Sequence, residues 1–141
     1  MTFKPIAITQ GDAAGIGPEI IVKAFRDAPD QLQGCVVVGD LAVMQRAALL
    51  VAQCEYQEPH MQIQLVRDLH ETAQVKAPHT IPVVQVTQPL TTEQLPVWGQ
   101  ISATAGKLAA DCVVWACRAT AEKLPVSTTL TNVSISLKRS M

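Results

Sequence analysis

The residues best suited to chemistry lie in one short stretch, GDAAGIGPEI, at residues 11–20. Three glycines crowd this stretch, and glycine lets a backbone take unusual conformations or come close to a ligand. A β-prone segment precedes the stretch and a helix-forming one follows it, so free N–H groups and the positive end of a helix dipole would face a sheet edge. Asp12 adds a carboxylate that could orient a hydroxyl, a ring nitrogen or a water. The candidate cofactor-binding residues are therefore Gly11, Asp12, Gly15 and Gly17.

A tight turn is the alternative interpretation of the same stretch. The glycines would then serve only the turn between strand and helix, and Asp12 would accept hydrogen bonds from the loop's own amides. The spacing is not the GxGxxG fingerprint of dinucleotide-binding folds, and no GK[ST] follows it as in a P-loop. The residues alone leave both interpretations open.

Other reactive residue types give weaker signals. His60, His70 and His79 form no HxH or HxxxH pair, so we expect surface positions rather than a metal site. Ser102 has no His or Asp at a recognisable spacing and is expected to cap a helix rather than to act as a nucleophile. The remaining expectations are a solvated stripe for Asp111 and Glu122 and packing roles for Trp98 and Trp115.

The cysteines are expected to be free thiols. None of the four forms a CxxC pair, and the spacing of Cys112 and Cys117 turns them roughly 140° apart on a helix. Buried thiols in a reducing compartment explain this pattern better than a disulfide or a metal site. The set comprises Cys35, Cys54, Cys112 and Cys117.

Composition limits the class of protein. The chain has 141 residues, enough for one domain with a core, and is 48% hydrophobic but only 4% aromatic, so that core must be aliphatic. The net charge of −1 gives no field that would hold nucleic acid or an anionic membrane. No apolar run approaches the roughly 20 residues that span a bilayer. The opening residues lack the sections of a signal peptide, so a cytoplasmic protein is expected.

The elements that would position the glycine stretch alternate between strand and helix. Residues 4–9 predict a strand and residues 18–28 a helix, followed by a buried strand at 34–40 and a helix at 41–53 that Asp40 can cap. This order predicts an α/β fold made of βαβ units with a mostly parallel sheet. Further strands are predicted at 61–66 and 80–86, the second at a sheet edge because of Pro82.

The second half of the chain predicts a loop, a connector and one long helix. Residues 67–79 are polar and residues 88–100 read as an ordered connector, before a helix at 102–123. Charges form only a narrow stripe on that helix, containing two i,i+4 pairs, Lys107–Asp111 and Arg118–Glu122. Its remaining surface is mostly apolar, so we expect it to pack against a partner chain or a further domain.

Two segments resemble one enzyme family. ITQGDAAGIGPEII resembles the opening signature of the 4-hydroxythreonine-4-phosphate dehydrogenases, with Ala13 in place of the usual proline. GQISATAGKLAADCVVWA resembles the segment that opens a long helix in that family, and VVVGD at 36–40 also fits. The resemblance implies an incomplete isocitrate/isopropylmalate dehydrogenase-like fold. It divides the chain into a family-like α/β region at 1–123 and a divergent tail at 124–141.

The resemblance also implies an activity. Family members oxidise and decarboxylate a small phosphorylated hydroxy-amino acid in pyridoxal phosphate synthesis, as dimers that use NAD or NADP and a divalent cation. The family's metal-binding histidines and phosphate-binding basic residues would lie beyond Met141, and its motif after the long helix fits LPVSTTLTNVSISL poorly. We therefore expect a truncated chain that is inactive alone. An inactive relative and a small nucleotide- or phosphate-binding module are the alternatives, and the substrate and the choice of NAD or NADP stay open.

Overall fold

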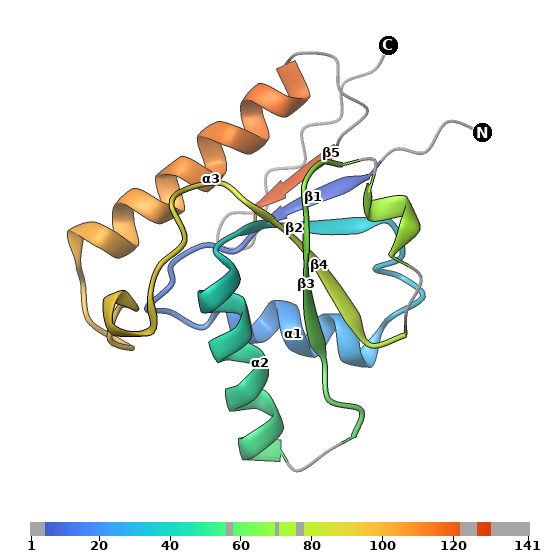
Figure 1. The fold of residues 1–141 in the computed structure, drawn as a ribbon, viewed down its shortest axis with the longest axis horizontal. Coiled ribbons are helices and arrows are strands. Elements are labelled where there is room, and N and C mark those ends of the chain that lie inside the picture. Colours follow the sequence, from blue (N-terminus) through green and yellow to red (C-terminus); the bar gives the residue numbers. More distant parts are fainter. Residues whose placement is uncertain (1–4, 56–57, 70, 76–77, 122–126, 131–141) are drawn as a thin grey trace.

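The computed structural model describes residues 5–55, 58–69, 71–75, 78–121 and 127–130. They form one parallel sheet in the order β3-β4-β2-β1-β5 (Figure 1). The strands are β1 Ile6–Thr9, β2 Cys35–Gly39, β3 Gln62–Val66, β4 Thr80–Gln85 and β5 Ser127–Leu130. The helices are α1 Gly17–Asp27, α2 Leu41–Glu55 and α3 Ala103–Ala121, with 3₁₀ turns at Glu71–Gln74 and Thr92–Gln94. The predicted α/β fold with a parallel sheet is confirmed.

Helices cover the sheet on both faces. Neighbouring residues of β2 point to opposite sides, as the two-residue period of a strand requires. Val37 packs in one core cluster with Phe25 of α1 and Met44 of α2. Val36 and Val38 pack in the other with Leu108 and Cys112 of α3. Figure 1 shows the result as three layers, with α1 and α2 below the sheet and α3 above it.

The prediction that Pro82 places its strand at a sheet edge is wrong. β4 lies between β3 and β2, and Pro82 is buried. Its register explains why this is tolerated. Pro82 lies opposite Gln64 of β3, but the pairing of β4 with β2 begins only at Val83. The N–H that proline lacks is therefore not missed on the β2 side.

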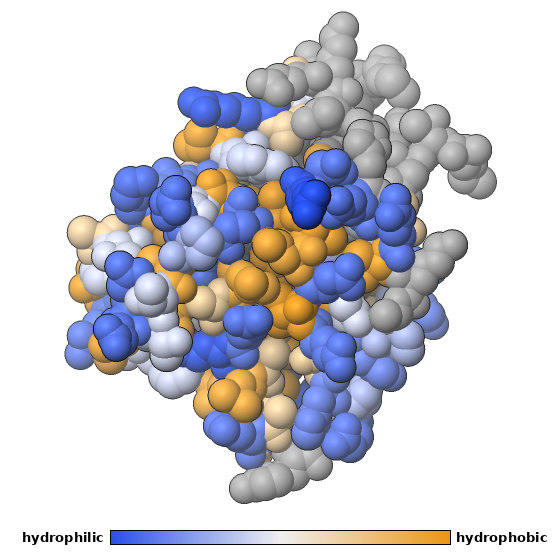
Figure 2. Space-filling view, viewed as in Figure 1, coloured by the Kyte–Doolittle hydropathy of each residue, from blue (hydrophilic) through white to orange (hydrophobic). Residues whose placement is uncertain are grey.

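The actual edge on that side is β3. Gln62 and Gln64 are exposed there, and the side chain of Leu65 is 49% exposed. Figure 2 shows apolar side chains gathered near the centre of the face on which β3 lies in front.

Helix α3 follows the prediction at its start and along its charged stripe. Ser102 Oγ accepts the Ala105 N–H at 3.1 Å, and Lys107 Nζ lies 2.5 Å from Asp111 Oδ2. The second predicted pair includes Glu122, which lies outside the described residues. One side of the helix is buried, while the opposite side exposes the uncharged residues Ala103, Ala110, Val114, Cys117 and Ala121. That a partner chain or a further domain packs against this side stays a prediction.

In the final segment, β5 extends the sheet beside β1, with Ile6 opposite Ser127 and Thr9 opposite Leu130. Residues 127–130, which fall in the divergent tail at 124–141, thus form a strand. Residues 122–126 and 131–141 lie outside the described part. In the described part, no helix combines the length and the apolar character needed to cross a lipid bilayer.

The four cysteines are free, as predicted, but only Cys35 and Cys112 are buried. The expectation that all four are buried is wrong for Cys54 and Cys117, which are exposed near the end of α2 and on the outer side of α3. Burial raises the pKa of the Cys35 thiol and raises that of Cys112 to about 12. Since the thiolate is the nucleophile, both buried thiols should be unreactive at neutral pH.

This difference predicts a thiol titration. With an aromatic disulfide reagent at pH 8, Cys54 and Cys117 should react quickly, and Cys35 and Cys112 should react only after unfolding in guanidinium. Absorbance counts the thiols, and serine variants of the exposed pair serve as controls. Fast reaction of Cys112 in the folded protein would contradict the packing of α3 on the sheet, and fast reaction of Cys35 would contradict that of α1 and α2.

Candidate functional site

The glycine stretch forms a compact loop between β1 and α1. Gly11 has φ of 76°, a conformation that glycine takes without strain. Asp12 is exposed, but its Oδ1 accepts the Ala14 N–H at 2.8 Å and its carbonyl accepts the Gly15 N–H at 3.0 Å. Pro18 occupies the first turn of α1, where it costs no hydrogen bond. For Gly11 and for one oxygen of Asp12, the turn interpretation is therefore sufficient.

Several loop amides are not used by the protein. Within the described residues, the N–H groups of Gly11, Ile16 and Gly17 donate to no acceptor. Glu19 adds a carboxylate in the first turn of α1, and Ile20 N donates to Ile16 O, so the helix ladder begins only there. Unpaired N–H groups at the start of a helix favour an oxygen anion, and the helix dipole acts in the same direction.

Gly15 separates the two interpretations. Its φ is not in the left-handed region, and a Cβ built there would approach nothing closer than Asp12 at 3.5 Å, which is ordinary contact. Neither conformation nor packing within the described residues requires a glycine at this position. Close approach of a ligand to the backbone would require one. Gly15 is thus the residue for which the binding interpretation explains more than the turn does.

A segment distant in the sequence holds the loop from one side. Gly99 N donates to Ala14 O at 2.8 Å, and Arg46 of α2 donates to Ala13 O at 2.7 Å and to Pro96 O at 2.6 Å. The Arg46 guanidinium also lies 4.5 Å from the centre of the Trp98 ring. The predicted packing role of Trp98 is therefore a stacking contact on a helix side chain. Arg46 was not among the sequence candidates, although it is the only charged residue in 41–53.

These contacts enclose a small hollow between the starts of α1 and α2. Ala13, Gly15 and Pro18 line one side of it, and Val43, Arg46 and Trp98 line the other. Its empty volume is about 160 Å³. That volume includes open solvent, and the space between these side chains is too small for a dinucleotide. A ligand of that size would lie on the open side of the loop, near the free amides.

A buried polar network lies next to the loop at the carboxyl ends of β1, β2 and β4. Asp40 is fully buried, and its Oδ1 caps α2 by accepting the Ala42 and Val43 N–H groups, as the sequence predicted. Its Oδ2 accepts Gln85 Nε2 at 2.7 Å and Leu90 N at 3.0 Å.

Gln10, the residue before the glycine loop, completes this network. Its Oε1 accepts the Asp40 N–H at 2.8 Å. Its Nε2 is buried and has no partner within the described part of the chain. Gln10 was not among the sequence candidates, because nothing in the local pattern distinguishes it from a loop residue.

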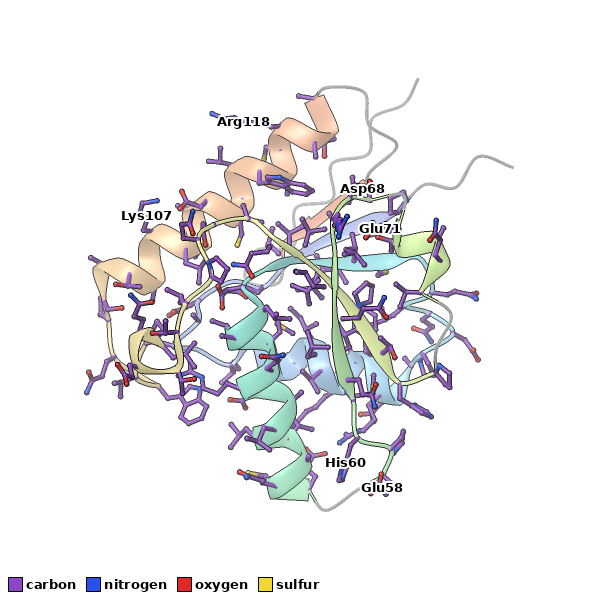
Figure 3. The ribbon with its side chains drawn as sticks, in the orientation of Figure 1. Glu58, His60, Asp68, Glu71, Lys107 and Arg118 are labelled. Carbon is purple, nitrogen blue, oxygen red and sulfur yellow. The ribbon has the colours of Figure 1, made fainter. Side chains whose placement is uncertain are left out.

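The histidines do not join this site. His60 is exposed and lies 3.2 Å from Glu58, beside the start of β3; Figure 3 shows the pair at the lower end of the molecule. His79 is exposed, and His70 lies outside the described residues. Among the residues that the structure describes, no three His, Cys, Asp or Glu side chains gather where they could hold a metal ion. Lys107 and Arg118 lie along α3 and point outward, as Figure 3 shows.

Relatives of known name match most of the chain. The D-threonate 4-phosphate dehydrogenase of Salmonella typhimurium strain LT2 is 38% identical over 115 residues, which are 80% of this chain and 32% of that protein. The 4-hydroxythreonine-4-phosphate dehydrogenase of Beijerinckia indica is 33% identical over 116 residues, covering 82% and 31%. This chain therefore spans about a third of the length of the relatives it matches. No protein-family model matches it.

Solved structures agree with the sequence relatives. The crystal structure of 4-hydroxythreonine-4-phosphate dehydrogenase from Klebsiella pneumoniae superposes with a TM-score of 0.70 at 31% identity, covering 90% of this chain and 36% of that one. A terephthalate 1,2-cis-dihydrodiol dehydrogenase from Burkholderia xenovorans LB400 gives 0.58 at 31% identity, covering 90% and 32%. The likeness thus includes dehydrogenases named for different substrates.

Proposed function

Because this chain is related in sequence and fold to the 4-hydroxythreonine-4-phosphate dehydrogenases along about a third of their length, we propose that it is part of an NAD- or NADP-dependent dehydrogenase. Its substrate would be a small phosphorylated hydroxy acid, oxidised at a secondary alcohol and then decarboxylated, as in pyridoxal phosphate synthesis. The homodimer implied by the resemblance and the cytoplasmic location expected from the opening residues stay predictions. So does the division of the chain at residue 123.

The free amides of the glycine loop carry this proposal. The N–H groups of Gly11, Ile16 and Gly17 would donate to phosphate oxygens of the dinucleotide, and the dipole of α1 would favour their negative charge. The open backbone at Gly15 would let the ligand come close. Asp12 Oδ2 has no hydrogen bond within the described residues and could accept one from a ligand hydroxyl. The bound nicotinamide would supply the hydride acceptor.

The divalent cation implied by the resemblance has no candidate site among the residues that the structure describes. A divalent cation prefers several carboxylate or imidazole ligands, and the described residues offer no such group. We therefore derive no step through a metal ion.

Dinucleotide binding to Gly15→Ala tests the proposal. The added Cβ meets only ordinary contacts with Asp12, so the unfolding free energy should change by less than about 0.5 kcal/mol. The Kd for NAD or NADP, measured by calorimetry, should rise about tenfold or more, because the proposal requires the ligand to approach the backbone at Gly15 closely.

Gly106→Ala is the matched control for this test. It places the same methyl group on an exposed helix position with open space around it. The control should bind with unchanged Kd. Equal Kd values for Gly15→Ala and the unmodified protein would reject the loop as the binding site.

Turnover separates the proposed enzyme from its alternatives. NAD reduction with 4-phosphohydroxythreonine and a divalent cation supports the dehydrogenase. Saturable binding without turnover supports a nucleotide- or phosphate-binding module that uses only the 11–17 loop. Neither signal, together with aggregation, supports an inactive relative whose exposed α3 face associates.

A further inference from the structure

Arg46 is placed to control the shape of the glycine loop. It comes from the second turn of α2, which packs against α1, and its guanidinium reaches both the loop at Ala13 and the connector at Pro96. The two hydrogen bonds, at 2.7 and 2.6 Å, use different terminal nitrogens. A planar guanidinium can bridge two carbonyls in this way, and a lysine ammonium on its flexible stem holds such a geometry less well.

The connector adds two more contacts around the same group. Trp98 stacks on the guanidinium at 4.5 Å, and Gly99 N donates to Ala14 O at 2.8 Å. Gly99 has φ of 75° and open space around it, so glycine is needed there for the bend that brings its N–H to the loop. Residues 96–99, which include the Trp98–Gly99 strap, therefore lie across Ala13 and Ala14, and Arg46 holds them there through its contacts with Pro96 and Trp98.

The charge of Arg46 is occupied within the protein. Both of its terminal nitrogens donate to backbone carbonyls, and the ring covers one face of the guanidinium. Partial burial lowers the pKa of Arg46, while the nearby Glu19 carboxylate opposes this shift. The side chain therefore acts through the loop rather than as a cation displayed to a ligand.

We infer that Arg46 is a positioning residue for ligand binding: together with the Trp98–Gly99 strap it fixes the glycine loop in the shape that leaves its amides free. The inference rests on the proposed function. It is distinct from a direct contact of Arg46 with a phosphate, in which a lysine would keep most of the affinity.

The experiment compares Arg46→Lys and Arg46→Gln in a Trp115→Phe background, in which Trp98 is the only tryptophan left. Two quantities are measured: acrylamide quenching of Trp98, and the Kd for NAD and NADP. Arg26→Lys is the matched control, since Arg26 is equally paired, with Asp27 and Glu55, but lies at the other end of α1.

We expect both Arg46 variants to raise the quenching constant of Trp98 about twofold and to weaken dinucleotide binding five- to tenfold, with Lys no better than Gln. Arg26→Lys should change neither quantity. Two outcomes overturn the inference. One is a raised quenching constant of Trp98 with an unchanged Kd. The other is an unchanged Kd and an unchanged quenching constant in Arg46→Lys.

Failure of the proposed function looks different from failure of this inference. If the unmodified protein binds neither dinucleotide, the proposed function falls. Whether Arg46 fixes the shape of the glycine loop is then decided by hydrogen exchange at the Ala14 and Gly15 amides, which donate hydrogen bonds within the loop. Exchange at these amides at least tenfold faster in Arg46→Lys supports it, and unchanged exchange rejects it.

Discussion

Replacing Asp40 by alanine should lower the free energy of unfolding by about 4 kcal/mol, a larger effect than we expect of other polar substitutions among the described residues. The side chain is fully buried and accepts four hydrogen bonds. Removing it uncaps α2, which costs about 1 kcal/mol. It also leaves the part-buried Leu90 N–H without its acceptor and Gln85 Nε2 with only Thr87 O, which together cost about 3 kcal/mol. Chemical denaturation followed by far-UV circular dichroism measures the loss.

Asp40→Asn is the control that separates the two halves of the carboxylate. The asparagine oxygen can cap α2, but its NH₂ group then faces the donors Gln85 Nε2 and Leu90 N. We expect the free energy of unfolding to fall by about 2–3 kcal/mol, less than in Asp40→Ala. If the free energy of unfolding of Asp40→Ala lay within about 1 kcal/mol of that of the unmodified protein, the cap and the Leu90 contact would not persist in solution.

The capping half of this network could be read from the sequence, and the rest could not. Asp40 follows an apolar strand and precedes a helical pattern, so its role at the start of α2 follows from local rules. Its contacts with Gln85 and Leu90 join residues 45 and 50 positions away. They depend on where β4 lies in the sheet, and the strand order is not a local property.

The same limit explains the error at Pro82. A proline within a strand pattern predicts an edge, because it cannot donate to a neighbour. The sequence does not reveal that the β2 pairing begins one residue later, at Val83. The aliphatic run at residues 34–40, in contrast, correctly predicted a strand buried on both faces, because the cores on both sides of the sheet need such residues.

The candidate site also consists of residues that the sequence identifies and residues that only the fold brings to it. Gly11, Asp12, Gly15 and Gly17 could be selected from their spacing, and the structure brings them together because they adjoin along the chain. Arg46, Trp98 and Gly99 reach the loop only through the tertiary fold. Arg46 is the only charged residue in the helix predicted at 41–53, and this could have signalled a specific partner.

The second large effect is expected at Gly39, on β2 beside Gln10. A Cβ at this position would lie 2.3 Å from Gln10 Oε1 and 2.8 Å from its Cδ, closer than real contacts allow. Gln10 cannot simply swing away, because it is fully buried and its Oε1 holds the Asp40 N–H. Gly39→Ala should therefore lower the unfolding free energy by about 3 kcal/mol, through overpacking and a lost buried hydrogen bond.

A double-mutant cycle with Gln10→Ala tests whether this clash is the cause. Gln10→Ala alone should cost about 2 kcal/mol, less than a well-satisfied buried glutamine, because its Nε2 has no partner in the described part of the chain. In that background Gly39→Ala has room for its methyl group, so its own cost should fall below about 1 kcal/mol. If the loss in the double variant equalled the sum of the two single losses within about 0.5 kcal/mol, the two side chains would not be in contact. Strong coupling would show that the residue before the glycine loop is held by β2, and hence that the loop starts from a fixed point at the sheet edge.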